Sequence, residues 1–134
     1  VVYFNPVPGG PKNALQRFDL DYWGNCFFQA MQRAALLARE AGVPVAVSGR
    51  QWGQMRLNAP RIPEVVVTNN DRRDHHLELV LMRGRKIDIV NTMHRSDILY
   101  RITTADGTPL CVVTPGPRYA EFESRLRRAR EMSR

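Results

Sequence analysis

The residues best suited to chemistry lie near the start of the chain, where Asp19 and Asp21 are followed by Tyr22 and Trp23. Two carboxylates this close together could share a site and act as general acid and general base. Such a pair normally works with a histidine, a metal or a phosphate-binding loop, and no spacing in the sequence supplies one. We therefore expect these carboxylates to cap a helix or form salt bridges, and we predict no catalytic residue in this chain.

A second polar group is the tract of residues 69–76, which contains Asp71, Asp74, His75 and His76. These residue types ligate metals. However, neighbouring side chains of an extended chain point apart, and no third histidine or cysteine stands at ligand spacing. The turn-like composition of the tract favours a solvated loop. We expect neither a metal nor any other cofactor in this chain.

A third group, residues 48–54, follows an apolar run at residues 43–47 that predicts a short strand. Open α/β sheets bind ligands at the carboxyl ends of their strands, so Arg50 is a candidate phosphate contact and Trp52 a candidate interaction residue. No glycine-rich phosphate-binding spacing is present. The favoured alternative is a turn that leads into a short helix ending at Leu57.

The chain contains two cysteines, Cys26 and Cys111, which are too few for a disulfide framework and lack the spacing of metal ligands. We predict that both are small, buried apolar side chains. A single disulfide between them, in an oxidising compartment, stays open as the alternative.

Two amphipathic helices are predicted to position these groups. Residues 25–41 place apolar side chains on one face at intervals of three and four, and Gly42 can end this helix. Residues 118–132 form a second helix with a narrower apolar stripe, after a break at residues 115–117. The apolar positions are Phe27, Ala30, Met31, Ala34, Leu37, Ala38 and Ala41 in the first helix, and Tyr119, Phe122, Leu126, Ala129 and Met132 in the second.

Short apolar runs predict the strands of a mixed sheet. A strand at residues 1–4, the first helix and the strand at residues 43–47 would form a right-handed unit with parallel strands. The prediction is therefore an α/β fold, with a mixed β-sheet and packed helices in a single domain of residues 1–134. Further strands are expected at residues 65–67, 77–82 and 87–90, with a short helix as the alternative for residues 77–82. A closing β-hairpin is expected at residues 98–114 around a turn at residues 105–107.

The chain is strongly basic, since 20 lysines and arginines against 13 acidic residues give a formal net charge of +7 at pH 7. Such a surface attracts polyanions without specificity. An anionic lipid layer is one expected partner, because each basic side chain near a membrane contributes about 1 kcal/mol. A nucleic-acid-binding module is the less favoured alternative, because the aromatic residues cluster in residues 3–23 instead of alternating with arginines on strands.

Residues 3–24 combine a strand ending in Tyr-Phe-Asn, a Gly-Gly turn and an Asp-Tyr-Trp-Gly segment directly before an amphipathic helix. This arrangement resembles the membrane-distal region of multi-spanning glycosyltransferases that use lipid-phosphate-linked sugars, such as protein O-mannosyltransferases and the aminoarabinose transferase of lipid A. Residues 99–113 are similar to the hairpin that closes such a domain. The matching residues of the first segment are Tyr3, Phe4, Asn5, Gly9, Gly10, Phe18, Asp21, Tyr22, Trp23 and Gly24.

The resemblance implies an extracytoplasmic, periplasmic C-terminal domain of an integral-membrane glycosyltransferase, excised from a longer protein. The implied partners are the transmembrane body upstream in the same chain and an anionic lipid or polyprenyl-phosphate-linked sugar. In the family, a loop near the first membrane helices carries the catalytic acid and has no counterpart here, so the isolated domain is expected to be inactive. Asn5, Tyr22 and Trp23 would face the membrane body, and Asp21 would fix the Tyr22-Trp23 turn against the helix start.

Overall fold

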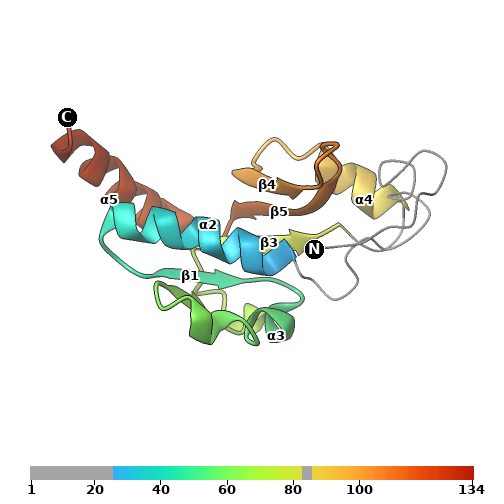
Figure 1. Ribbon diagram of the computed structural model, residues 1–134, viewed down its shortest axis with the longest axis horizontal. Helices are drawn as coiled ribbons and strands as arrows, with labels where there is room; N and C mark the ends of the chain where they lie inside the picture. The colour runs from blue at the N-terminus through green and yellow to red at the C-terminus, as the bar shows by residue number, and fades with distance from the viewer. Residues whose placement is uncertain (1–25, 83–85) are drawn as a thin grey trace.

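An open five-stranded sheet is the centre of the computed structural model, which describes residues 26–82 and 86–134 (Figure 1). The strand order is β2-β1-β3-β5-β4. Strands β2, β1 and β3 are parallel, whereas β5 runs antiparallel to both β3 and β4. The strands are β1 (Val45–Ser48), β2 (Val65–Val67), β3 (Leu77–Leu81), β4 (Tyr100–Thr103) and β5 (Pro109–Pro115).

This sheet and its helices confirm the predicted α/β class with a mixed sheet. The closing hairpin is also confirmed, because β4 and β5 pair antiparallel around a turn at Gly107, whose φ of +84° suits glycine. The strand predicted at residues 1–4 lies outside the described residues. So do four of the candidate interaction residues, namely Asn5, Asp21, Tyr22 and Trp23.

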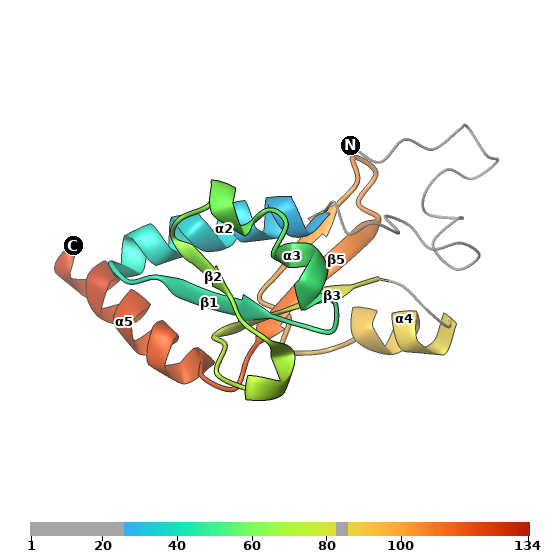
Figure 2. The ribbon, with the colours of Figure 1, turned by 90° about the horizontal axis from the view of Figure 1, so that it is seen from below.

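Helix α2 (Cys26–Ala41) covers one face of the sheet (Figure 2). Its predicted apolar face is confirmed: most of the expected side chains are buried, and Leu37 and Ala41 are partly buried. The hydroxyl of Tyr100 donates a hydrogen bond of 2.8 Å to the carbonyl oxygen of Ala30, which ties this helix to β4. Gly42 ends the helix with φ +71°.

Side chains alternate between the two faces of each strand. On β3, Leu77, Leu79 and Leu81 are buried, whereas Glu78 and Val80 are half-buried. In the antiparallel register, Leu79 lies beside Val113 and Val113 lies beside Tyr100, the residue that contacts α2. Glu78 and Val80 therefore belong to the face turned away from α2.

Helix α4 (Lys86–Met93) lies on that second face, on the opposite side of the sheet from α2 (Figure 2). The strand predicted at residues 87–90 is therefore wrong. The β-branched residues of this stretch favour a strand. In the helix that forms instead, Ile89 is on the buried side, whereas Ile87 is 56% exposed. Thr92 supports the helix by donating a 2.8 Å hydrogen bond to the carbonyl oxygen of Asp88.

Helix α5 (Tyr119–Met132) packs against α2 and confirms the predicted C-terminal helix. Phe122 and Leu126 are buried, but Met132 is 88% exposed, so the apolar stripe ends before the last turn. A 2.7 Å ion pair between Arg130 and Glu40 also joins the two helices. The remaining elements are the short helix α3 (Trp52–Met55) and the 3-10 turns η1 (Ala59–Arg61) and η2 (Asn70–Arg72).

Candidate functional site

Strands β1 and β3 are parallel neighbours that point toward the same edge of the sheet, with Ser48 at the end of β1 paired to Glu78 near the start of β3, which continues to Leu81. From this edge the chain continues in opposite directions. The connection after β1 leads through α3 to β2, and the connection after β3 leads through α4 to β4 at the far side of the sheet. Adjacent strands whose connections diverge leave a crevice, which is where open α/β sheets bind ligands.

A cavity of about 320 Å³ lies at this crevice. This volume is at the lower end of the range for small-ligand pockets. Each surrounding element contributes to its wall: the turn after β1, the 3-10 turn after β2, strand β3 and helix α4. The lining residues are Arg50, Gln51, Asn70, Glu78, Leu79, Val80, Leu81, Asp88 and Thr92.

Arg50 reaches the cavity because of the glycine that precedes it. A Cβ on Gly49 would collide with the carbonyl oxygen of Leu79 and lie 3.1 Å from Cε of Met55. A residue without a side chain therefore lets the chain leaving β1 pass directly against β3. The next residue, Arg50, is exposed and stands at the rim of the cavity.

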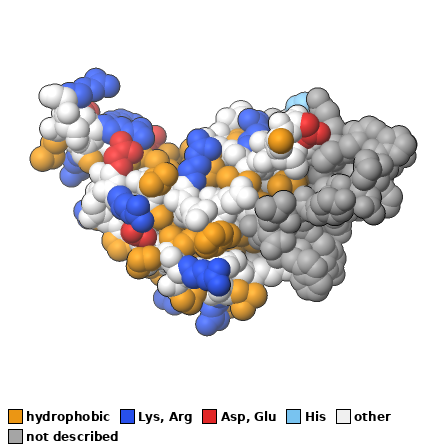
Figure 3. All heavy atoms as spheres, in the orientation of Figure 1, with side chains coloured by type: hydrophobic (Ala, Val, Ile, Leu, Met, Phe, Trp, Pro, Cys, Tyr) orange, Lys and Arg blue, Asp and Glu red, His pale blue; other side chains and the backbone are white. Residues whose placement is uncertain are grey.

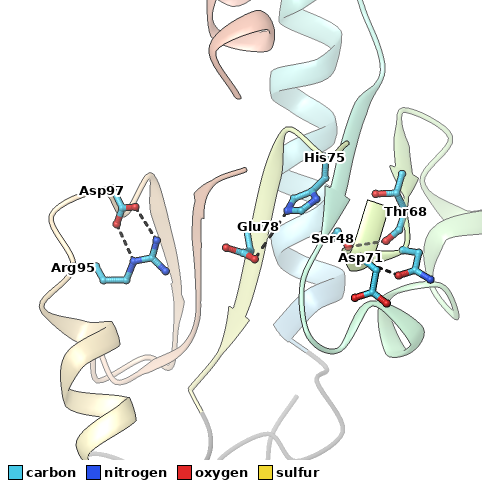
Figure 4. A network of polar contacts seen from close by, with 8 residues as sticks. Ser48, Thr68, Asp71, His75, Glu78, Arg95 and Asp97 are labelled. Atoms are coloured by element: carbon cyan, nitrogen blue, oxygen red, sulfur yellow. Dashed lines mark hydrogen bonds and ion pairs between the residues drawn. The ribbon is translucent and has the colours of Figure 1, made fainter. Parts of the chain in front are cut away.

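Two hydrogen bonds fix the turn that carries Asn70 (Figure 4). The hydroxyl of the fully buried Ser48 donates to the carbonyl oxygen of Thr68 over 2.6 Å, which joins the ends of β1 and β2. The side chain of Asn69 then accepts a 2.9 Å hydrogen bond from the backbone N–H of Asp71, as an N-cap does. Asn70 is thereby held at the cavity, and its Oδ1 atom is buried without a hydrogen-bond partner among the described residues.

The charges around the cavity are mixed. Arg50 brings a guanidinium to the lining, whereas Glu78 and Asp88 bring carboxylates. The nearby Arg95 is already bound to Asp97 through hydrogen bonds of 2.9 and 2.7 Å (Figure 4). Arg50 lines the cavity, and its role as a ligand contact stays a prediction, whereas the carboxylate of Glu78 in the same lining weakens the electrostatic case for a phosphate.

The side chain of His75 lies next to that of Glu78, with its Nε2 atom 4.0 Å from Oε1 of Glu78 (Figure 4). Its side chain has no exposed surface, and neither ring nitrogen has a hydrogen-bond partner among the described residues. Burial lowers the pKa of His75, so its ring is neutral at pH 7. The backbone of Gly116 makes this packing possible, because a Cβ there would lie 2.7 Å from Cδ2 of His75.

The predicted solvated loop at residues 69–76 is therefore wrong for its histidines. His76 accepts a 2.9 Å hydrogen bond at Nδ1 from the backbone N–H of Ala46, and its ring lies 5.5 Å from that of Phe122. Both histidines are part of the packing between β1, β3 and α5. Within the described part of the chain, no group of three or more histidine, cysteine or acidic side chains could hold a metal ion.

Two of the predicted interaction residues, Arg50 and Trp52, lie in the described part of the chain. Arg50 lines the cavity, and Trp52 does not. Trp52 is half-buried, and the guanidinium of Arg56 lies 5.4 Å from the centre of its ring. The turn into α3 that was the favoured alternative for this stretch is also present. Cys26 and Cys111 are both buried thiols, as predicted.

Asn70, Glu78 and Asp88 were missed by the sequence reasoning. Asn70 could have been predicted, since it follows the predicted strand at residues 65–67 in the same way that Arg50 follows the predicted strand at residues 43–47. Glu78 lies within an apolar strand, and Asp88 lies in a stretch predicted as the wrong element. For these two, only the observed register and the position of α4 reveal the site.

No family model, curated protein or solved structure matches this chain. The site therefore rests on its own geometry. No helix within residues 26–82 and 86–134 is both long and apolar enough to cross a bilayer.

Proposed function

We propose that this chain is the extracytoplasmic C-terminal domain of an integral-membrane glycosyltransferase. In this role it carries no catalytic residue of its own. It packs on the transmembrane body of the same protein and assists the binding of donor or acceptor. The observation that carries this proposal is the sequence of residues 3–24, which resembles that region of the lipid-phosphate-sugar-dependent enzymes.

Two structural features support the proposal. The segment of residues 99–113, similar to the closing hairpin of such domains, coincides with the β4–β5 hairpin. In addition, the cavity beside β3, just beyond the end of β1, gives the domain a place to hold part of a substrate. A ligand bound there would contact Arg50 at the rim.

The proposal is tested by locating the domain relative to the membrane in cells that produce the full-length protein. Met132→Cys supplies a reporter thiol, because Met132 is 88% exposed while Cys26 and Cys111 are buried. A thiol reagent that cannot cross the inner membrane should label this variant in intact cells. The matched control is Leu126→Cys, which places the new thiol at a buried position of the same helix and should react far more slowly.

Labelling that requires permeabilised inner membranes would overturn the extracytoplasmic assignment. Recovery of the full-length protein in the soluble fraction, without detergent, would overturn the membrane origin.

A further inference from the structure

We propose that the cavity between the turn after β1, β3 and α4 binds a neutral, polyhydroxylated ligand about the size of one sugar ring. This inference deepens the proposed function and rests on it for the choice of sugars as the biological ligand. The binding itself is a property that the isolated chain should show.

The first argument is the balance of hydrogen-bonding groups. Carboxylates only accept hydrogen bonds, and Glu78 lines the cavity. The Oδ1 atom of Asn70 is a further acceptor, buried and without a partner among the described residues. A ligand that donates hydrogen bonds, as hydroxyl groups do, complements such a lining, whereas phosphate offers mainly acceptors.

The second argument is the state of Glu78. Its carboxylate lies 4.0 Å from the ring of His75, and burial keeps that imidazole neutral at pH 7. The guanidinium of Arg95 is engaged by Asp97 through two hydrogen bonds. Glu78 therefore keeps accepting capacity for a ligand, and its negative charge opposes an anion in the same space.

Arg50 completes the polar lining at the rim. Its planar guanidinium can donate parallel hydrogen bonds to neighbouring oxygens, and adjacent hydroxyls of a sugar can accept them. Because the same hydroxyls also donate, one ring can satisfy Arg50 on one side and Glu78 or Asn70 on another. A ring that carries hydroxyl groups on several sides can therefore form hydrogen bonds with donors and acceptors on different sides of the cavity.

The size and rigidity of the cavity also suit a single ring. Its volume of about 320 Å³ is small for a ligand site, and Leu79, Val80 and Leu81 contribute an apolar part to its wall. The carbon-bound hydrogens of a sugar can pack there. The surrounding turns are fixed by Gly49 against Leu79, by the Ser48–Thr68 hydrogen bond and by the Asn69 cap, so the ligand meets a largely preformed site.

The test is direct binding to the purified 134-residue chain, followed by two-dimensional amide NMR. The probes are the neutral hexoses D-glucose, D-mannose and D-galactose, and separately inorganic phosphate. At least one hexose should bind saturably and shift the amide signals of Gln51, Asn70, Leu81 and Thr92. Glu78→Gln, which keeps the shape and removes the charge, should weaken that binding at least tenfold.

Arg56→Gln is the matched control, because Arg56 is an exposed arginine on the same connection that lies over Trp52 and not in the cavity. It should leave hexose binding unchanged, whereas Arg50→Gln should weaken it. Unchanged dispersion of the amide spectrum shows that each variant is folded.

The inference is overturned if none of the hexoses shifts the cavity signals. It is also overturned if phosphate binds there more tightly than every hexose and Glu78→Gln strengthens that binding. A chain that binds no hexose but is labelled outside the membrane leaves the proposed function standing. Conversely, hexose binding by a protein without membrane spans would keep the cavity assignment and overturn the membrane role.

Discussion

Gly49 decides the path of the chain at the cavity, because the carbonyl oxygen of Leu79 occupies the place of its missing Cβ. We predict that Gly49→Ala lowers the free energy of unfolding by roughly 1–3 kcal/mol, the usual effect of forcing an extra methyl into a packed site. The loop must also shift away from β3, so Arg50 moves with it. Urea unfolding followed by circular dichroism measures the loss of stability.

Gly53 provides the matched control for this substitution. It lies in α3, and a Cβ there would meet no atom within 4 Å. Gly53→Ala should therefore be neutral or slightly stabilising, since alanine favours a helix by about 0.5–1 kcal/mol over glycine. Equal stability of the two alanine variants would contradict the packing that we describe at Gly49.

His75 and His76 link stability to pH. Burial lowers the pKa of each from its ordinary value of 6.5, and for His76 the positive charge of Arg118 lowers it further. Below pH 6.5 the unfolded chain therefore binds protons that the folded chain does not, and the free energy of unfolding falls as the pH drops. The carboxylates of Glu64 and Asp97, whose pKa values their arginine partners lower, contribute to acid sensitivity only at lower pH.

We predict that stability decreases between pH 7 and pH 5 and that His75→Gln loses part of this decrease, because glutamine does not titrate. Urea unfolding at the two pH values measures the effect. The control is His94→Gln, which makes the same substitution at an exposed histidine and so separates the effect of burial at His75 from the loss of any one imidazole. An identical pH dependence in the wild type and in His75→Gln would show that His75 is not buried as a neutral ring.

At the scale of the elements, α5 depends on few apolar anchors. Phe122 and Leu126 are its buried side chains within the described structure, and most of its other positions are exposed. We predict that Phe122→Ala destabilises the fold by about 3–5 kcal/mol, the usual cost of deleting a buried aromatic ring. Thermal unfolding and near-ultraviolet circular dichroism would detect the loss of α5 packing.

Met132→Ala is the control on the same helix. Met132 is 88% exposed, so this change should alter stability by less than about 0.5 kcal/mol. If the two alanine variants were equally stable, α5 would not be held to the rest of the fold by Phe122.

The elements were predictable to different degrees for physical reasons. Helix α2 has a continuous apolar face over its whole length, and such a face gives a clear period of 3.6 residues. Residues 87–90 belong to helix α4, in which Ile89 is the buried apolar side chain. One buried position gives only a weak helical pattern in the sequence, so the β-branched side chains led to the prediction of a strand. The buried state of His75 depends on contacts with Gly116, about 40 residues later in the chain, which no local pattern records.

The candidate site was predictable only where its residues follow a strand. Arg50 is the second residue after β1, a position that the rule for carboxyl ends of strands singles out. Glu78 and Asp88 line the same cavity as Arg50 because β3 pairs with β1 and α4 lies over the second face of the sheet. That arrangement is set by pairing across the sheet and not by spacing along the chain.

At the scale of the whole molecule, the net charge of +7 comes from basic side chains that have acidic side chains between them. At the start of α5, Arg118 just before the helix pairs with Glu121 at 2.6 Å, and within the helix Arg127 lies 3.8 Å from Glu123. Figure 3 shows acidic side chains among the basic ones over this helix. Such alternation does not favour the nucleic-acid alternative, because binding along a nucleic-acid backbone uses clustered cations. A membrane-tethered domain remains the proposal that the sequence of residues 3–24 supports best.

The measurement that tests this proposal most directly is sugar transfer from a polyprenyl-phosphate donor by the full-length membrane protein carrying Trp23→Ala. We predict that this variant reaches the membrane in normal amount but transfers sugar about tenfold more slowly, equivalent to about 1.4 kcal/mol of lost stabilisation. The control Trp52→Ala should retain activity, and the isolated 134-residue chain should have none. Full activity of Trp23→Ala, or transfer by the isolated chain, would contradict the account.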